Sequence, residues 1–288
     1  MKSSKIAMLT LMGATLSSTA VFADSAAHTD HAVADSVITE QRAALAKNTT
    51  GEGFGPQSPR DIDAKVGENT VQFSTAPKSS QMNLCNIHFH KYAEHKGGEF
   101  TKFMGNGDGM GNGTGFAYSG KLSADELKPT APACPSSHGG LVPGDTIEVH
   151  YVHSTADVVP GESLGACLSP SIKNPQFRVE AQVYVLVNDE SALDFAKLAE
   201  VREQGNYYQA VNIPKNSGSP VEYAGSTTGP KYNEEGSPFQ VTWSVRPKVQ
   251  KVNIATVGEW CKGNEFNEDH AHGVRNLVTN PALLSNMK

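Results

Sequence analysis

The sequence has no excess of basic residues, no collagen-like glycine at every third position and, beyond its first residues, no long apolar run. Its 288 residues carry 24 Lys and Arg against 30 Asp and Glu, a formal net charge of -6, which argues against nucleic acid and anionic lipid as partners. Charged residues make up only 19% of the chain, and its 27 glycines are far from one residue in three. These values exclude a coiled coil and a collagen, so we expect a globular protein.

The one apolar run lies at the N-terminus. Lys2 and Lys5 precede an apolar stretch over residues 6–16, and a small-residue cleavage site ends at Ala23. The stretch is far shorter than the roughly 20 residues that a membrane-spanning helix needs. The sequence therefore predicts a signal peptide over residues 1–23, a periplasmic or secreted protein and no membrane span, and it leaves the oligomeric state open.

Cysteine is scarce, with four residues that all remain after signal cleavage: Cys85, Cys134, Cys167 and Cys261. None stands in a CxxC pair, which argues against a zinc ribbon or a thioredoxin site. An even number of cysteines in an oxidising compartment predicts two disulfides. Sequence alone leaves three connectivities open. We favour Cys134–Cys167, which would bracket one strand, with Cys85–Cys261 tying early to late chain.

Glycine and proline (27 and 16 residues) favour turns and short strands over long helices. Alternation and β-branched residues predict strands over residues 70–74, 83–92, 146–153, 177–188 and 239–245. A short helix is predicted over residues 36–47 with Ser36 as its cap, and the most convincing helix over residues 191–204.

These elements predict one β-rich domain. We expect residues 24–52 to form a flexible N-terminal segment and residues 53–288 a single catalytic domain. Residues 97–144 are the most irregular stretch, with glycine at every second position at the centre, and indicate an inserted loop. No Gly-Lys-Ser/Thr follows the glycines, and the acidic spacing of a calcium loop is absent, so neither a phosphate cradle nor an EF-hand is expected.

Two histidines on one predicted strand suggest a metal site. Residues two apart on a strand share a face and lie about 6.6–6.8 Å apart, so His88 and His90 can converge on one ion at about 2.0–2.1 Å each. The same spacing recurs at His270 and His272, which shows that the pair is not decisive by itself.

A second predicted strand strengthens this interpretation. Glu148 and His150 share one face of it, and His153 takes the other. A neutral histidine ligand needs an acceptor for its second ring nitrogen. Glu148 can serve His150 or a neighbour across the sheet, and Asn86 can serve the histidine two residues after it. Three histidines with an open fourth position are typical of a catalytic zinc site.

These residues resemble the zinc-binding strands of α-type carbonic anhydrases. Three further segments resemble that family in the same order: residues 57–63, residues 223–228 with Pro230, and residues 241–243. The His-x-His-x3-Glu-His spacing over residues 88–95 and the glycine-rich insertion are more similar to the δ-class or δ-like enzymes. The resemblance covers roughly residues 53–285. It implies an exported bacterial member with a mainly β (α+β) fold, a large twisted, mostly antiparallel sheet with peripheral helices.

The resemblance also implies an activity, the reversible hydration of CO2 to bicarbonate and a proton through zinc-bound hydroxide. One Zn2+ per chain would be held by His88, His90 and His150, with Asn86 and Glu148 behind the ligands. Glu94 would pair with a threonine that orients the nucleophile: Thr228 in an ungapped alignment, Thr227 if one residue is skipped. Val152, Val241 and Trp243 would form the apolar wall beside CO2.

Two features leave alternatives open. Residues 67–73, where the α-type enzymes carry a proton-shuttle histidine, contain none, so Glu68, His138 or a terminal histidine would have to replace it. The His-x-His-x3-Glu spacing also fits a cupin, in which Glu94 would be a ligand to iron or manganese. A non-catalytic relative that only binds zinc is the third possibility.

Overall fold

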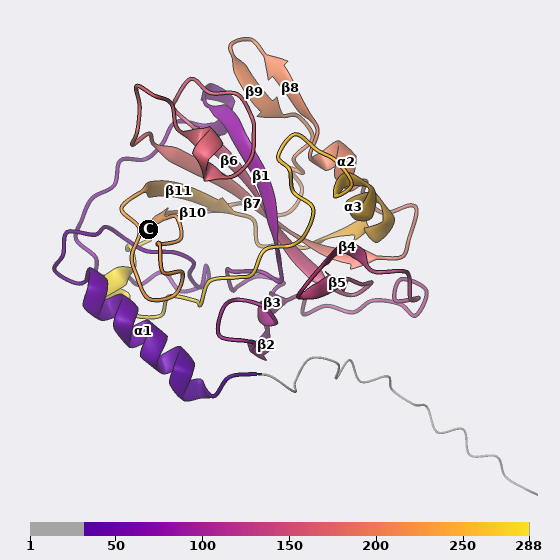
Figure 1. The fold of residues 1–288 in the computed structure, drawn as a ribbon, viewed down its shortest axis with the longest axis horizontal. Coiled ribbons are helices and arrows are strands. Elements are labelled where there is room, and N and C mark those ends of the chain that lie inside the picture. Colours follow the sequence, from indigo (N-terminus) through magenta and orange to yellow (C-terminus); the bar gives the residue numbers. More distant parts are fainter. Residues whose placement is uncertain (1–31, 288) are drawn as a thin grey trace, which may run out of the picture.

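A six-stranded mixed sheet runs through the middle of the protein (Figure 1). The structure is a computed structural model that describes residues 32–287, so the predicted signal peptide lies outside the described residues. The sheet consists of β1 (Asn83–Lys91), β6 (Thr146–Ser154), β7 (Phe177–Val187), β10 (Val221–Ser226), β11 (Gln240–Val245) and β12 (Gln250–Asn253). Its order is β1-β6-β7-β11-β10, with β12 also beside β7.

Three of the five pairings in this sheet are antiparallel. β1 with β6, β6 with β7, and β10 with β11 are antiparallel, whereas β7 runs parallel to β11 and to β12. Four of the five predicted strands are present with bounds within two residues. The mainly β fold expected from the sequence is confirmed.

Short elements surround the sheet. Three hairpins are formed by β2 (Lys102–Asn106) with β3 (Thr114–Ala117), β4 (Ala133–Ser136) with β5 (Gly139–Leu141), and β8 (Val201–Gln204) with β9 (Tyr207–Ala210). The helices are α1 (Asp35–Thr49), α2 (Phe195–Leu198) and α3 (Ile254–Trp260), with 3-10 turns η1 (Ser79–Gln81), η2 (Leu164–Cys167) and η3 (Pro281–Leu283). Between residues 32 and 287, none of these helices has the length and apolar character needed to span a bilayer.

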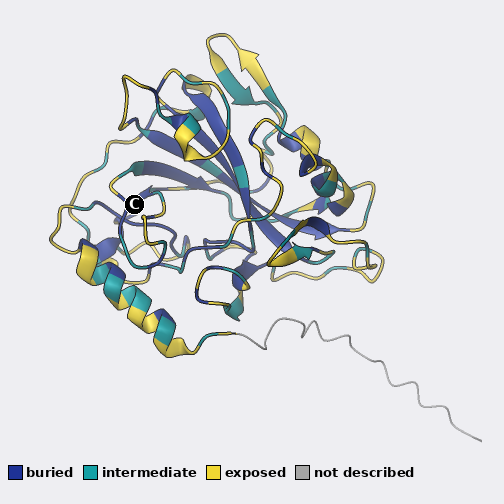
Figure 2. Cartoon of the chain, in the orientation of Figure 1, coloured by how far each residue is buried: buried dark blue, intermediate teal, exposed yellow. Residues whose placement is uncertain are grey.

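Both faces of the sheet are buried (Figure 2). All nine residues of β6 are buried, and alternate residues of β6 and β7 belong to two different core clusters. One cluster packs the sheet against α2 and α3 and includes Ile87, Phe89, Tyr151, Phe195 and Trp260. The other lies on the face of the candidate site and includes Val152, Phe177, Val179, Val241 and Trp243.

The two disulfides expected from the sequence form, but their predicted pairing is wrong. The bonds are Cys85–Cys167 and Cys134–Cys261. Cys85 and Cys167 belong to the cluster on the site face, and Cys134 and Cys261 belong to the cluster on the opposite face. Because the sheet separates the two clusters, neither of the predicted pairs could meet.

The predicted helix over residues 191–204 is also wrong. Only the single turn α2 is helical there, and β8 follows it and pairs with β9. The turn between these strands contains Gly205, whose φ of +65° suits a tight hairpin turn. Val201 and Tyr208 pack against the core from the hairpin, so tertiary burial outweighs the weak helical periodicity.

The glycine-rich insertion is more ordered than a loop. The hairpins β2–β3 and β4–β5 lie within residues 97–144, and four of the alternating glycines, Gly107, Gly109, Gly111 and Gly113, occupy the turn between β2 and β3. The strand predicted over residues 70–74 does not form. There, Asn69 Oδ1 accepts the Val71 N–H at 3.0 Å, a local turn contact that replaces sheet pairing.

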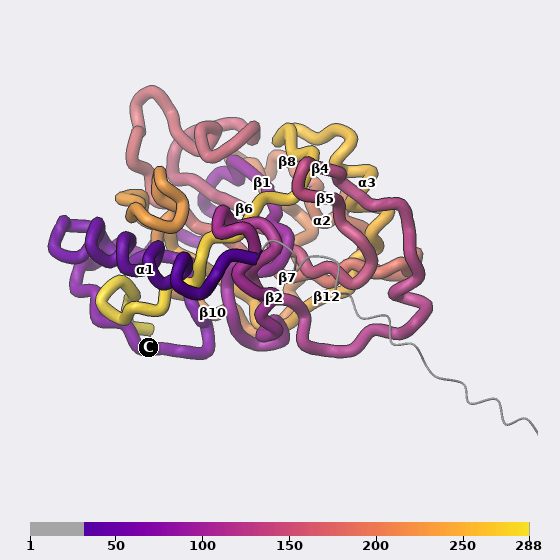
Figure 3. Tube along the Cα trace, turned by 60° about the horizontal axis from the view of Figure 1, so that its bottom comes forward, coloured from indigo at the N-terminus to yellow at the C-terminus, as the bar shows by residue number. Residues whose placement is uncertain are grey.

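The helix α1 confirms the short helix expected near residues 36–47, but the predicted cap at Ser36 is wrong, because the helix begins at Asp35 and Ala34 is its N-cap residue. Leu45 packs against Val278 and Leu283, and Arg42 Nε donates to the carbonyl of Leu277, so α1 lies along the C-terminal segment (Figure 3). Residues 35–49 are therefore an ordered part of the fold rather than a flexible segment.

The buried side chain of His153 predicts how the stability of the fold depends on pH. It lies on β6, is buried, and its Nδ1 is 3.0 Å from the carbonyl oxygen of Tyr151. Burial lowers its pKa from 6.5 to about 4, so between these values the unfolded chain binds more protons than the folded one. The free energy of unfolding is therefore expected to decrease as pH falls from 6.5 through 4, by about 3 kcal/mol from this group. Urea denaturation at pH 7 and 4.5 in the presence of a chelator measures this, and an equal pH dependence in His153→Asn would contradict it.

Candidate active site

Three histidines meet on one face of the sheet. The register of β1 and β6 places His88 directly opposite His150, and His90 shares the face because it follows His88 by two residues. One nitrogen of each imidazole lies within 4.8 Å of those of the other two. The structure thus brings together the three ligands expected from the sequence.

Asn86 and Glu148 hold the second ring nitrogens of two of these histidines. His88 Nδ1 lies 2.6 Å from Asn86 Oδ1, and the Asn86 amide nitrogen donates to the carbonyl of Gly161 at 3.1 Å, which distinguishes the two ends of the amide. His150 Nε2 lies 3.0 Å from Glu148 Oε1. Because these oxygens only accept, the protons sit on His88 Nδ1 and His150 Nε2.

The partner of His90 is a backbone carbonyl. His90 Nδ1 lies 2.8 Å from the carbonyl oxygen of Gly273, which also accepts from the hydroxyl of Tyr232. His90 Nε2 is buried and has no hydrogen-bond partner within the described part of the chain. Sequence reasoning missed Gly273, because a backbone acceptor 183 residues away leaves no side-chain signature.

The other ring nitrogen of each of the three histidines therefore carries a lone pair, and these lone pairs face one point. His88 Nε2 and His150 Nδ1 are 3.2 Å apart, and neither carries the proton of its neutral ring. Nitrogens bound to one tetrahedral ion at about 2.0–2.1 Å stand about 3.4 Å apart, close to this separation. A buried set of acceptors without a donor is satisfied by a cation, and three neutral imidazoles suit zinc with a fourth position left for a ligand.

Burial favours the neutral forms of His88 and His90. It lowers the pKa of His90 to about 4 and the pKa of His88 well below its ordinary value, and the neighbouring His150 acts in the same direction on both. Burial by itself would raise the pKa of Glu148, but His95 and the hydrogen bonds from His150 and His95 hold that pKa well below its usual range. Neutral imidazoles beside an ionised carboxylate form the state that binds a metal ion.

Glu148 also begins a buried hydrogen-bond chain whose members the sequence did not identify. Its Oε1 lies 2.6 Å from His95 Nδ1, and His95 Nε2 lies 2.7 Å from the hydroxyl of Tyr223. That hydroxyl is 3.0 Å from Ser58 Oγ, which accepts the Ser226 N–H at 3.2 Å. The chain links a metal-site carboxylate to the turn that carries the two candidate threonines. Ser58 and Tyr223 lie in segments that resemble the carbonic anhydrases, but only folding shows that they meet His95.

Glu94 and both threonines line one cavity with the histidines. Glu94 is buried, and its Oε1 accepts the Arg275 N–H at 2.8 Å. Thr227 Oγ1 shares a 2.6 Å hydrogen bond with Ser237 Oγ. The side chain of Thr228 is exposed and makes no hydrogen bond to a described residue, and neither threonine is bonded to Glu94 over residues 32–287. Thr228 is thus the threonine with an unengaged hydroxyl.

The cavity beside the histidines is small and mainly apolar. It holds about 80 Å³, and Val152, Val241 and Trp243 line it as expected, together with Phe177 and Val179. These side chains also belong to the core cluster of this face, so the same residues form the cavity wall and part of the core. A pocket of this kind suits a small neutral molecule.

A wider outer cavity of about 650 Å³ lies in front of His88 and His90. Its wall carries the further histidines His138, His270 and His272. His272 Nε2 lies 2.7 Å from Glu268 Oε2, and this hydrogen bond raises the pKa of His272 above its ordinary value. Glu68 lines neither cavity, and its backbone N–H donates to the carbonyl of Pro281.

One family model matches the chain. The model of the delta carbonic anhydrase family matches residues 79–256. This range includes β1 and β6, which carry the three histidines, and the neighbouring strand β7. A search of curated proteins finds no match.

Two solved structures are similar at low identity. An alpha-carbonic anhydrase of Photobacterium profundum is 18% identical, with 79% of this chain and 88% of that chain covered and a TM-score of 0.27. A hyperthermostable carbonic anhydrase identified from an active hydrothermal vent chimney is 14% identical, with 78% and 85% covered and a TM-score of 0.28.

Proposed function

Because the chain belongs to the delta carbonic anhydrase family, we propose that it catalyses the zinc-dependent, reversible hydration of CO2 to bicarbonate and a proton. One observation supports zinc as the metal: three proton-free imidazole nitrogens converge on one point. The buried nitrogen His90 Nε2 has no other partner in the described structure, so the site is incomplete without a cation.

Zinc, when bound, supplies a Lewis acid that lowers the pKa of a coordinated water to about 7. His88, His90 and His150 would hold it. Asn86 and Glu148 keep the rings of His88 and His150 oriented and their protons away from the metal position, as the carbonyl of Gly273 does for His90. These contacts preorganise the three ligands for metal binding.

Glu94 and Thr228 would orient the attacking oxygen. An ionised carboxylate only accepts hydrogen bonds, so a threonine hydroxyl beside it must donate to it and is left to accept from the nucleophile. We assign this role to Thr228 because the hydroxyl of Thr227 is engaged by Ser237. The apolar wall of Val152, Val241 and Trp243 would hold CO2, which is neutral and interacts weakly, beside the nucleophile.

The proton released in each cycle has no obvious carrier at the family's position, because residues 67–73 contain no histidine. We expect this transfer to limit turnover, so imidazole buffer should raise kcat several-fold at saturating CO2. Stopped-flow assays over a range of imidazole concentrations at constant ionic strength measure the effect. A kcat that is independent of imidazole would show that a group of the protein, such as His138 or His272 in the outer cavity, already carries the proton.

We also propose that the enzyme works in the periplasm or outside the cell. The two disulfides fit an oxidising compartment, and the sequence of residues 1–23 is typical of a signal peptide. CO2 and bicarbonate diffuse through such compartments, so the location is compatible with the proposed reaction.

The cupin alternative does not hold. The chain belongs to a carbonic anhydrase family, and Glu94 is outside the group of residues whose atoms converge on the metal position. The carboxylate of Glu94 instead accepts the Arg275 N–H.

The proposal is tested by measuring CO2 hydration of the purified chain by stopped flow before chelation, after chelation and after zinc is restored. We expect one zinc per chain, loss of activity on chelation and recovery with zinc. A folded chain that holds one zinc without activity would instead identify a non-catalytic relative. A different resident metal would overturn the zinc assignment.

A further inference from the structure

β1 carries a β-bulge at Cys85. Leu84 lies opposite His153 and Asn86 opposite Val152, which leaves Cys85 as the extra residue of the strand. Leu84 packs in the core cluster behind the sheet, whereas Cys85 packs with Val152 in the cluster on the site face. Bulges re-aim side chains next to active sites. Here the bulge puts Cys85 on the same side of the sheet as the first residue of the metal site, Asn86.

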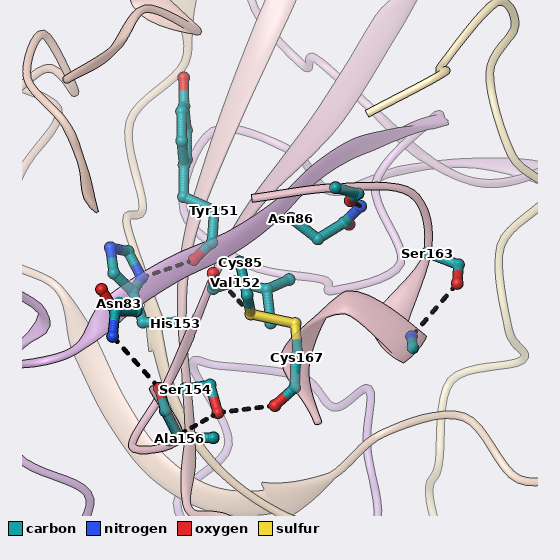
Figure 4. Close-up of a disulfide and its surroundings, with 12 residues drawn as sticks. Asn83, Cys85, Asn86, Tyr151, Val152, His153, Ser154, Ala156, Ser163 and Cys167 are labelled. Carbon is teal, nitrogen blue, oxygen red and sulfur yellow. Dashed lines mark hydrogen bonds between the residues drawn. A yellow bond between two sulfur atoms is a disulfide. The ribbon is translucent and has the colours of Figure 1, made fainter. Parts of the chain in front are cut away.

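The disulfide of Cys85 ties β1 to the segment that follows β6, residues 155–168 (Figure 4). Its partner Cys167 ends η2, and the carbonyl of Cys167 accepts from Ser154 Oγ at 2.8 Å. Near the middle of the segment, the Gly161 N–H donates to the carbonyl of Cys85 at 3.0 Å. Since this segment has no regular structure apart from η2, the disulfide is the covalent link that keeps Gly161 against the bulge.

The carbonyl of Gly161 decides which way the Asn86 amide points. Asn86 Nδ2 donates to it at 3.1 Å, which leaves Asn86 Oδ1 facing His88 Nδ1 at 2.6 Å. If the amide were turned over, its NH2 group would face His88 Nδ1, and that nitrogen would have to accept. The imidazole proton would then sit on Nε2, the nitrogen that faces the metal position, and a protonated nitrogen does not bind a cation.

We propose that the Cys85–Cys167 disulfide is a positioning element of the metal site. It holds the carbonyl of Gly161, which keeps Asn86 oriented and so keeps His88 Nε2 free for zinc. This inference rests on the proposed zinc site and adds to it a covalent control of metal retention. The disulfide Cys134–Cys261 lies in the core cluster behind the sheet and supplies a matched comparison.

The test compares the double variants Cys85→Ala/Cys167→Ala and Cys134→Ala/Cys261→Ala with the wild type. Each protein is loaded with zinc, and the rate of zinc transfer to a chromophoric chelator is measured together with the thermal midpoint. Both variants are expected to lose thermal stability, but only the first should release zinc about 10-fold faster. Equal release rates in the two variants would overturn the inference. A wild type that binds no zinc would overturn the proposed function itself.

A second comparison separates positioning from general loosening and uses a milder change. Ser154→Ala removes the hydrogen bond to Cys167 and keeps the disulfide, so it tests the same segment if the double variant does not fold. It should accelerate zinc release about 3-fold, and this effect should vanish in an Asn86→Ala background, because the proposed route from the segment to His88 runs through Asn86. An effect of the same size in both backgrounds would show that Asn86 is not the route and would contradict the inference.

Discussion

Replacing His150 by alanine is expected to abolish stoichiometric zinc binding and to lower kcat/KM for CO2 hydration by about 1,000-fold or more. His150 supplies one of three converging lone pairs, and its other nitrogen is the partner of the buried carboxylate Glu148. Two remaining imidazoles leave too few ligands for a tetrahedral zinc site, so water loses the ion that lets it ionise near neutral pH. Zinc content by elemental analysis and stopped-flow hydration rates measure the two effects.

The matched control is His153→Asn. His153 lies on the same strand, is buried like His150, and faces the opposite side of the sheet. This variant should keep one zinc and near wild-type activity at 25 °C. Near-UV circular dichroism verifies that both variants are folded. A His150→Ala protein that is folded, zinc-loaded and active would refute the ligand set.

Replacing Glu94 by alanine is expected to lower kcat/KM by about 100-fold while zinc content stays at one per chain. In the proposed site the three histidines would hold the ion, so its binding would not require Glu94. In the proposed mechanism, the variant would lack the acceptor to which the threonine hydroxyl donates when it orients the nucleophile. Glu190→Ala serves as the control, because Glu190 is exposed and does not line the cavity.

The threonine is identified by the same assay. Thr228→Val should reproduce the loss seen in Glu94→Ala, and Thr227→Val should remain close to the wild type. The reverse result would show that Thr227 orients the nucleophile and that its hydrogen bond to Ser237 is not maintained during catalysis. Loss of zinc from Glu94→Ala would show that Glu94 is a metal ligand after all.

Local sequence was sufficient wherever the strand period decided the outcome. Alternation on β1 puts Asn86, His88 and His90 on one face, and alternation on β6 does the same for Glu148 and His150. A period of two is a property of the backbone, so it holds whatever the strands pack against. For this reason both histidine strands and two of the three acceptors could be predicted from the residues themselves.

Local sequence failed where competing structures have similar propensity. Residues 201–204 carry a weak helical pattern, yet they form β8 because pairing with β9 lets Val201 and Tyr208 cover the core. The disulfides failed for a related reason. Which cysteines can meet depends on the face of the sheet that each one reaches, and the bulge at Cys85 changes that face without any signal in the spacing of the cysteines.

The sequence by itself determined the chemistry of this protein: three imidazoles in two strands, their side-chain acceptors, and an apolar wall beside them. Tertiary structure alone decided what surrounds that chemistry. The carbonyl of Gly273 reaches His90 across 183 residues, and His95 meets Tyr223 across 128 residues. Contacts of this kind depend on chain paths, and a backbone carbonyl is identical at every position. Such partners can therefore be identified only when the path of the whole folded chain is known.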